Sequence, residues 1–258
     1  MSIPIKKQKE KNMAVIFRFS NENLSSYQKL YDFNDARVLS VGGSGDQYFT
    51  AILNGAKEVT LFDRDPNFWP YFATKFYAIQ AISYNEFLKH FVWNDRFQPM
   101  FDSAEQYMPA KVKDAINEKV IKRNIATGFC NSEIFYAIET KAIPYLDSIG
   151  YERLQQNLKG RDLPDIHITD IRDLPKEVGK NPYDIMLTSN IYDWISRITT
   201  PTEYLSLLDN FNCPIFQAMY AHEFPVQSEE FRQRCKEVKI DGFVNSTTEK
   251  DYVYTYKK

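Results

Sequence analysis

"VLSVGGSGDQY" (residues 38–48) runs from an apolar, β-branched segment directly into three glycines and a serine. The apolar residues 36–41 predict a fully buried strand, and residues 46–54 predict a short helix that Gly55 ends. A second apolar run, "EVTLFD" at 58–63, predicts another buried strand, which ends on Asp63. Strand, glycine turn, helix and strand in this order predict a compact βαβ unit and therefore a parallel sheet.

The rest of the chain alternates helical and extended patterns. Residues 66–158 carry apolar residues at helical spacing, and this length exceeds one ordinary crossover, so we expect a helical insertion at about 66–160. Strands are predicted at 165–170, 183–189 and 213–220, and "EVKIDGF" and "DYVYTYK" predict a closing antiparallel hairpin. The expected fold class is α/β with a mostly parallel sheet, in a single domain over residues 1–258.

The composition argues against several classes of protein. The 258 residues include 32 Lys and Arg against 34 Asp and Glu, and a net charge of -2 is not that of a general nucleic-acid binder. No apolar stretch approaches the roughly 20 residues of a membrane helix, and the amino terminus turns charged too early for a signal peptide. Two sets of side chains lack metal-ligand spacing: Cys130, Cys213 and Cys235, and His90, His167 and His222. We therefore expect a cytoplasmic protein with reduced thiols and no metal site.

The glycine turn has the features of a ligand-binding loop. Glycines let backbone N–H groups approach a ligand, and the following helix presents its positive end; the competing interpretation is a tight turn without a ligand. Asp63 ends the second strand about 20 residues after Gly43, where an acidic side chain can bind ribose hydroxyls. The dinucleotide pattern GxGxxG/A fits poorly because Tyr48 takes the place of its third small residue, and no P-loop pattern is present.

Three segments resemble a known superfamily. "RVLSVGGSGDQ…NGAKEVTLFDRDP" resembles motifs I and II of the class I S-adenosylmethionine-dependent transferases, "HITDIRDLP" their adenine-contacting acidic segment, and "PYDIMLTSNIYDW" their fourth-strand motif. "FSNENLSSYQKLYDF", "SVGGSGDQ" and "AISYNEFLKHF" narrow the resemblance to the S-adenosylmethionine:diacylglycerol 3-amino-3-carboxypropyltransferase (betaine-lipid synthase) family. The resemblance covers residues 15–92 well and 163–195 more loosely. It implies a Rossmann-like seven-stranded sheet whose last two strands are antiparallel.

The resemblance also implies S-adenosylmethionine as the cofactor and a role for individual residues. Asp63 would bind the ribose hydroxyls, Asp46 would lie near the ammonium group, and Asp170 and Ile171 would flank the adenine. The loop residues that would line the amino-acid half are Gly42, Gly43, Ser44 and Gly45. For Asp170 the competing interpretation is a turn cap, which aspartate favours on local grounds.

The segment after the fourth predicted strand would face the acceptor. There Asp193 would act as a general base and Tyr192 would orient the acceptor, with Asn190 beside them. The competing interpretation is an N-capping turn, with Asn190 as the cap and Trp194 in the core. The aromatic segments "NFWPYFATKFY" and "NSEIFYAIE" are interpreted as helix packing, with a lid over an apolar acceptor as the alternative.

Two departures from the common pattern bear on the reaction. Ser40 stands where common methyltransferases have an acidic residue, and Ser44 replaces the middle glycine; both favour aminocarboxypropyl over methyl transfer. The absence of a (D/N)PP(Y/F) motif disfavours amino-methylation of a base or glutamine. The expected function is transfer of a 3-amino-3-carboxypropyl or methyl group to a small-molecule or lipid acceptor. No nucleic-acid partner is expected. The resemblance to the betaine-lipid synthase family is compatible with peripheral membrane contact. The alternatives are a non-catalytic S-adenosylmethionine-binding protein and an NAD-dependent oxidoreductase.

Overall fold

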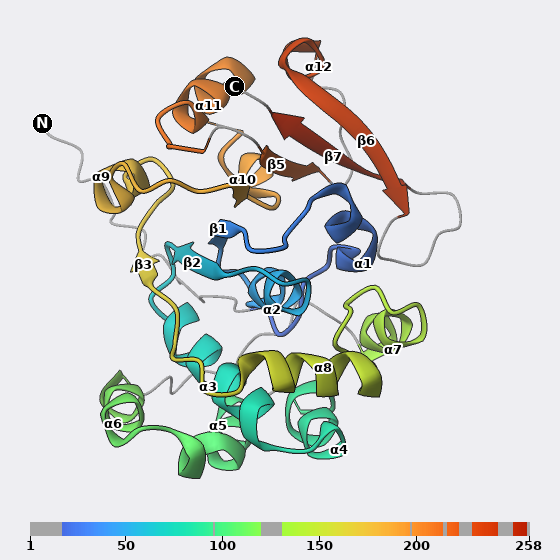
Figure 1. Ribbon diagram of the computed structural model, residues 1–258, viewed down its shortest axis with the longest axis vertical. Helices are drawn as coiled ribbons and strands as arrows, with labels where there is room; N and C mark the ends of the chain where they lie inside the picture. The colour runs from blue at the N-terminus through green and yellow to red at the C-terminus, as the bar shows by residue number, and fades with distance from the viewer. Residues whose placement is uncertain are drawn as a thin grey trace, which may run out of the picture.

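A computed structural model describes residues 17–94, 96–119, 131–196, 198–213, 216–221, 229–241 and 250–256. In this part of the chain one seven-stranded sheet has the order β3-β2-β1-β4-β5-β7-β6 (Figure 1). The strands are β1 Arg37–Val41, β2 Glu58–Asp63, β3 Ile166–Ile168, β4 Ile185–Leu187, β5 Phe216–Ala221, β6 Cys235–Asp241 and β7 Lys250–Tyr256. Histidine 222 and cysteine 130, named above, lie outside the described residues.

The strand directions agree with the expected fold class. Pairs β1–β2, β1–β4, β2–β3 and β4–β5 are parallel, whereas β5–β7 and β6–β7 are antiparallel. The prediction of an α/β fold with a mostly parallel sheet and a closing antiparallel hairpin is therefore confirmed. The strands β3 and β4 are shorter than predicted, because the chain turns at Asp170 and again at Ser189, which has a φ of 52°.

Helices separate the strands along the chain. Between β2 and β3 the chain forms α3 Phe68–Ala81, α4 Tyr84–Phe87, α5 Phe97–Ala104, α6 Ala110–Lys119, α7 Asn131–Glu139 and α8 Ser148–Leu158. A short π-helix at Leu88–Val92 follows α4, and a short 3-10 helix at Glu105–Tyr107 follows α5. This region coincides with the predicted helical insertion. The remaining helices are α1 Leu24–Tyr27 (followed by a turn at Gln28–Leu30), α2 Asp46–Leu53, α9 Leu174–Val178, α10 Ile191–Ile195, α11 Pro201–Leu208 and α12 Glu229–Arg234.

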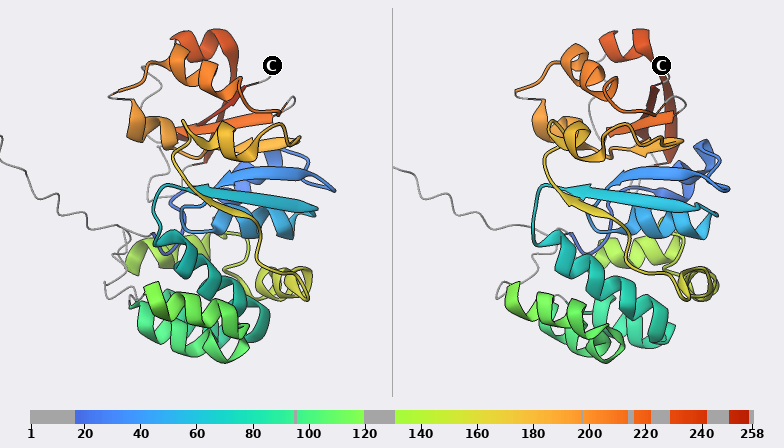
Figure 2. Two further views of the ribbon diagram at one scale, coloured as in Figure 1. Left: turned by 90° about the vertical axis from the view of Figure 1, so that its left-hand side faces the viewer. Right: turned by 60° about the vertical axis from the view of Figure 1, so that its left-hand side comes forward.

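Both faces of the sheet are covered, which explains the continuous apolar character of the strands. On β1, Val38 belongs to a core shared with α2, α3 and α8, whereas Leu39 belongs to a second core shared with α9 and α11. Figures 1 and 2 show the helices α3–α6 at one end of the molecule, with α11, α12 and the hairpin at the other. No helix in the described part of the chain is long and apolar enough to cross a membrane.

The aromatic segments differ from each other. The α3 segment packs into the core as interpreted: Phe72 is fully buried and stacks on Phe49 with ring centroids 5.5 Å apart. The α7 segment is only partly buried, because Phe135 is 56% exposed and stacks on Trp93 at 4.6 Å. Helix packing therefore accounts for the first segment and only partly for the second.

Candidate functional site

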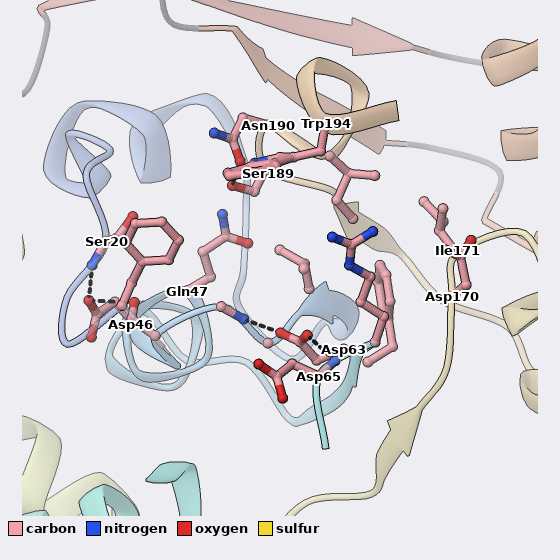
Figure 3. Close-up of a pocket in the computed structure, with 18 of the residues that line it drawn as sticks. Ser20, Asp46, Gln47, Asp63, Asp65, Asp170, Ile171, Ser189, Asn190 and Trp194 are labelled. Atoms are coloured by element: carbon pink, nitrogen blue, oxygen red, sulfur yellow. Dashed lines mark hydrogen bonds between the residues drawn. The ribbon is translucent and has the colours of Figure 1, made fainter. Parts of the chain in front are cut away.

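The site lies where the strand order reverses. β1 is flanked by β2 on one side and by β4 on the other, and ligands of open α/β sheets bind outside the carboxyl ends of the strands at such a point. A cavity of about 920 Å³ opens there, at the large end of the range for small-molecule sites. Its walls come from the loops that follow β1, β2, β3 and β4, and from residues 17–21 (Figure 3).

The glycine loop is shaped by its contacts with β2 and α3. The Gly42 N–H donates to the Phe62 carbonyl at 2.7 Å, and a Cβ on Gly42 would lie 2.6 Å from the Phe68 ring. Gly43 and Gly45 have φ values of 53° and 81°, in the left-handed region that favours glycine. A Cβ on Gly43 would meet no atom within 4 Å, so the loop backbone is open on that side.

Asp63 lines the cavity, and its role as the ribose-binding residue stays a prediction. Its Oδ2 accepts from the Gly43 N–H at 2.9 Å, and its Oδ1 accepts from the Asp65 N–H at 2.9 Å (Figure 3). Burial raises the pKa of Asp63, while the Asp65 and Gly43 N–H groups act in the opposite direction. Each carboxylate oxygen has a second lone pair, so Asp63 can still accept hydrogen bonds from a ligand.

Asp46 is hydrogen-bonded from within the protein, so the structure gives no direct support for the role expected for it. Its carboxylate is fully buried and accepts from Lys75 Nζ at 2.6 Å, from Ser44 Oγ at 2.8 Å, from the Tyr145 hydroxyl and from the Ser20 N–H. Four donors match the roughly four acceptor positions of a carboxylate. Asp46 lines the cavity, but Lys75 neutralises its charge, and its place near a ligand ammonium group stays a prediction.

Figure 3 shows Asp170 and Ile171 on the opposite side of the cavity from Ser20. Arg172 binds the Asp170 carboxylate through Nε at 2.7 Å and Nη2 at 3.0 Å, and this ion pair lowers the pKa of Asp170. The Arg172 N–H also donates to Asp170 Oδ1 at 3.0 Å, which is the turn contact of the competing interpretation. Asp170 therefore forms the turn and lines the cavity at the same time, with Ile171 beside it.

The residues after β4 separate into two groups. Ser189, Asn190 and Trp194 line the cavity, and Trp194 is 62% exposed, so the interpretation that placed it in the core is wrong. Asn190 is the N-cap residue of α10, but its side chain makes no capping hydrogen bond.

Tyr192 points the other way. It is 7% exposed, and its ring packs against Tyr204 and Phe231 at centroid distances of 5.2 and 4.8 Å. It does not line the cavity, which removes the geometric support for Tyr192 as the residue that orients an acceptor. Asp193 lies in α10, but its side chain falls outside the described residues, so its role as a base stays a prediction.

Sequence reasoning did not assign the contribution of the segment before β1. Ser20 and Asn21 line the cavity, and Glu22, 1% exposed, lies directly behind it. Glu22 Oε2 accepts from Gln47 Nε2 at 2.8 Å, and its Oε1 accepts from the Ser189 hydroxyl. The only available signal was the resemblance of "FSNENLSSYQKLYDF", since contacts across 25 or more residues leave no periodic pattern.

The charged groups on the cavity surface are mostly acidic. Asp63 and Asp65 stand beside the exposed Arg64, and Asp170 is paired with Arg172. Asp65 Oδ1 accepts from the backbone and side-chain amides of Asn67 at 2.9 and 2.8 Å. This surface suits a neutral or cationic ligand better than a polyanion. Among the described residues, no group of three or more His, Cys, Asp or Glu side chains could hold a metal ion.

No family model matches the sequence, and no curated protein matches it. Solved structures with a related architecture include the rRNA methyltransferase aviRa from Streptomyces viridochromogenes, with 17% identity, a TM-score of 0.43 and coverage of 86% of this chain and 76% of that one. An rRNA methylase from Streptococcus thermophilus has 6% identity and a TM-score of 0.39, over 90% and 96% of the two chains. SMU.1697c from Streptococcus mutans, in complex with SAH, has 10% identity and a TM-score of 0.37, over 89% and 96%. Because these TM-scores are below 0.5, we assign neither a cofactor nor an acceptor from these proteins.

Proposed function

We propose that the protein is an S-adenosylmethionine-dependent transferase that moves a 3-amino-3-carboxypropyl or methyl group to a small-molecule or lipid acceptor. The observation that supports this best is the Asp63 carboxylate, which the Gly43 N–H holds at 2.9 Å at the point where the strand order reverses. A carboxylate fixed beside a glycine loop in this position suits recognition of ribose hydroxyls.

The other lining residues fit the remaining parts of such a cofactor. Ile171, next to Asp170, offers an apolar surface for an adenine ring, and the Gly43 backbone leaves space for the amino-acid half. The sulfonium would then lie toward Asn190 and Trp194. A mostly acidic surface suits the positive charges of the sulfonium and ammonium groups.

The chemistry places few demands on the protein. S-adenosylmethionine supplies a carbon activated by a positively charged sulfur, which leaves as a neutral thioether. The site must align the acceptor with this carbon and exclude water, tasks that suit the walls formed by Phe17, Ile191 and Trp194. The proton lost by the acceptor requires a base, and Asp193 is the candidate that we propose.

The first test is a calorimetric titration with S-adenosylmethionine, with NAD in parallel. Saturation at one equivalent of S-adenosylmethionine, lost in Asp63→Ala, is the expected result. At 100 times its dissociation constant the ligand should stabilise the fold by about 2.7 kcal/mol. Binding of NAD alone would favour the oxidoreductase alternative, and binding of neither would favour a glycine turn without a ligand.

Product analysis then distinguishes the reactions. Aminocarboxypropyl transfer leaves methylthioadenosine, whereas methyl transfer leaves S-adenosylhomocysteine. An acceptor screen should cover small amines, diacylglycerol in vesicles, and RNA, because turnover with RNA would overturn the expectation of no nucleic-acid partner. Binding of S-adenosylmethionine without either product from any acceptor class would support the non-catalytic alternative.

A further inference from the structure

Glu22 is a buried carboxylate bound to two side chains that line the cavity. It lies in the segment before α1 and is 1% exposed. One oxygen accepts from Gln47 Nε2 at 2.8 Å, and the other accepts from the Ser189 hydroxyl. These two partners come from α2 and from the end of β4, so Glu22 joins the two sides of the point where the strand order reverses.

Its position is informative in relation to Ser40. Ser40 is a neutral residue of β1, and it is fully buried. The Ser40 hydroxyl donates to Gln47 Oε1 at 2.9 Å, and the opposite end of the same amide donates to Glu22. Glu22 therefore places a carboxylate at the end of the Gln47 amide opposite the neutral Ser40 hydroxyl.

The hydrogen bonds fix what Gln47 and Ser189 present to a ligand. Gln47 is held at both ends, because its oxygen accepts from Ser40 and its nitrogen donates to Glu22. Ser189 has one hydroxyl proton, and the Glu22 carboxylate is a stronger acceptor for it than the Asn190 amide oxygen, which lies 3.4 Å away. Because this proton goes to Glu22, the Ser189 oxygen can only accept a hydrogen bond from a ligand.

We propose that Glu22 is a positioning residue that makes this corner of the cavity selective for an ammonium group, acting through Gln47 and Ser189. The carboxylate lies in a poorly solvated environment, where a negative charge attracts a cation more strongly than it does in water. A ligand ammonium group donates to the Ser189 oxygen and is stabilised by the charge behind it. The inference rests on the proposed function, because it assigns the amino-acid end of S-adenosylmethionine to this corner.

The test compares two ligands that differ in the amino-acid group. S-adenosylhomocysteine carries the ammonium group, whereas 5′-methylthioadenosine has the same nucleoside and thioether without it. We expect Glu22→Gln to weaken the binding of S-adenosylhomocysteine about tenfold or more, which is the scale of one charge-assisted hydrogen bond. The affinity for methylthioadenosine should change by no more than about twofold. Glu58→Gln is the matched control, since Glu58 is a half-exposed carboxylate at the start of β2 that pairs with Arg37.

Several outcomes would overturn the inference. An equal loss for both ligands means that Glu22 only supports the fold of the site, and no loss for either means that its charge is not used. If the Glu22→Gln variant does not fold, Ser189→Ala is tested in its place. We expect it to lose affinity for S-adenosylhomocysteine selectively. If the wild-type protein binds neither ligand, the proposed function itself is wrong. If it binds methylthioadenosine as tightly as S-adenosylhomocysteine, only the proposed ammonium site is wrong.

Discussion

The Asp63 carboxyl titrates at a higher pH than an ordinary aspartate, because burial raises its pKa more than the Asp65 and Gly43 N–H groups lower it. Ribose hydroxyls bind best to the ionised form, so ligand binding lowers this pKa. The affinity for S-adenosylmethionine is therefore expected to rise with pH through the Asp63 pKa and to level off above it. Calorimetry between about pH 4 and pH 7 measures this dependence.

Asp170 provides the control for this titration. Hydrogen bonds from Arg172 lower its pKa, so Asp170 stays ionised in the window where Asp63 titrates. We expect Asp170→Asn to change the affinity at every pH without moving the inflection. An affinity that does not change with pH in the wild-type protein would contradict the assignment of Asp63 to the ligand.

The buried pair of Asp46 and Lys75 predicts a large effect on stability. Both side chains are fully buried, and Lys75 Nζ also donates to the Arg18 and Ser44 carbonyls at 2.9 and 3.1 Å. Lys75→Met leaves the carboxylate without its cation and is expected to lower the free energy of unfolding by about 3–5 kcal/mol. Urea denaturation measures the loss. The double variant Lys75→Met with Asp46→Asn should lose less free energy of unfolding than the two single variants lose in sum. Additive losses would show that the two charges do not interact.

At the scale of elements, α10 offers an internal comparison. Tyr192 is buried against Tyr204, whereas Trp194, two positions further along, is 62% exposed in the cavity wall. Tyr192→Ala is expected to lower the free energy of unfolding by about 3–5 kcal/mol, as for other large aromatic residues in cores. Trp194→Ala should change the free energy of unfolding by no more than about 0.5 kcal/mol but should reduce turnover. Denaturation curves and product formation measure the two effects, and the reverse pattern would place Tyr192 and not Trp194 at the acceptor.

Local elements could be predicted from the sequence because their signals are local. The strand ending on Asp63 matches β2, and the helix predicted at 46–54 matches α2 to within one residue. Trp194 could not be placed, because a five-residue helix such as α10 is too short for its periodicity to distinguish the buried face from the exposed face. The resemblance places Asp46 near the ligand, and the sequence gives no signal for its partners Lys75 and Tyr145, which lie 29 and 99 residues further along the chain.

At the scale of the whole molecule, the site depends on segments that are distant in the sequence. Residues 17–22, the loop 42–46 and the turn at 189–194 meet at the cavity, and Glu22 is hydrogen-bonded to Gln47 and Ser189. These links run through side chains, which explains why the sheet was predictable and this assembly was not. They also imply that the three segments respond to a ligand together.

Hydrogen exchange with and without S-adenosylmethionine tests this coupling. Amides that open locally exchange more slowly when a ligand stabilises the closed form, so all three segments should gain protection at the same ligand concentration. The hairpin β6–β7 is the internal control, because none of the described residues of its two strands lines the cavity. Glu22→Gln should weaken the protection of 189–194 more than that of the loop, since Asp46, Lys75 and Tyr145 hold the loop independently. Protection confined to the loop would mean that the segments bind the ligand separately, and protection spread evenly to the hairpin would mean global stabilisation without a shared site.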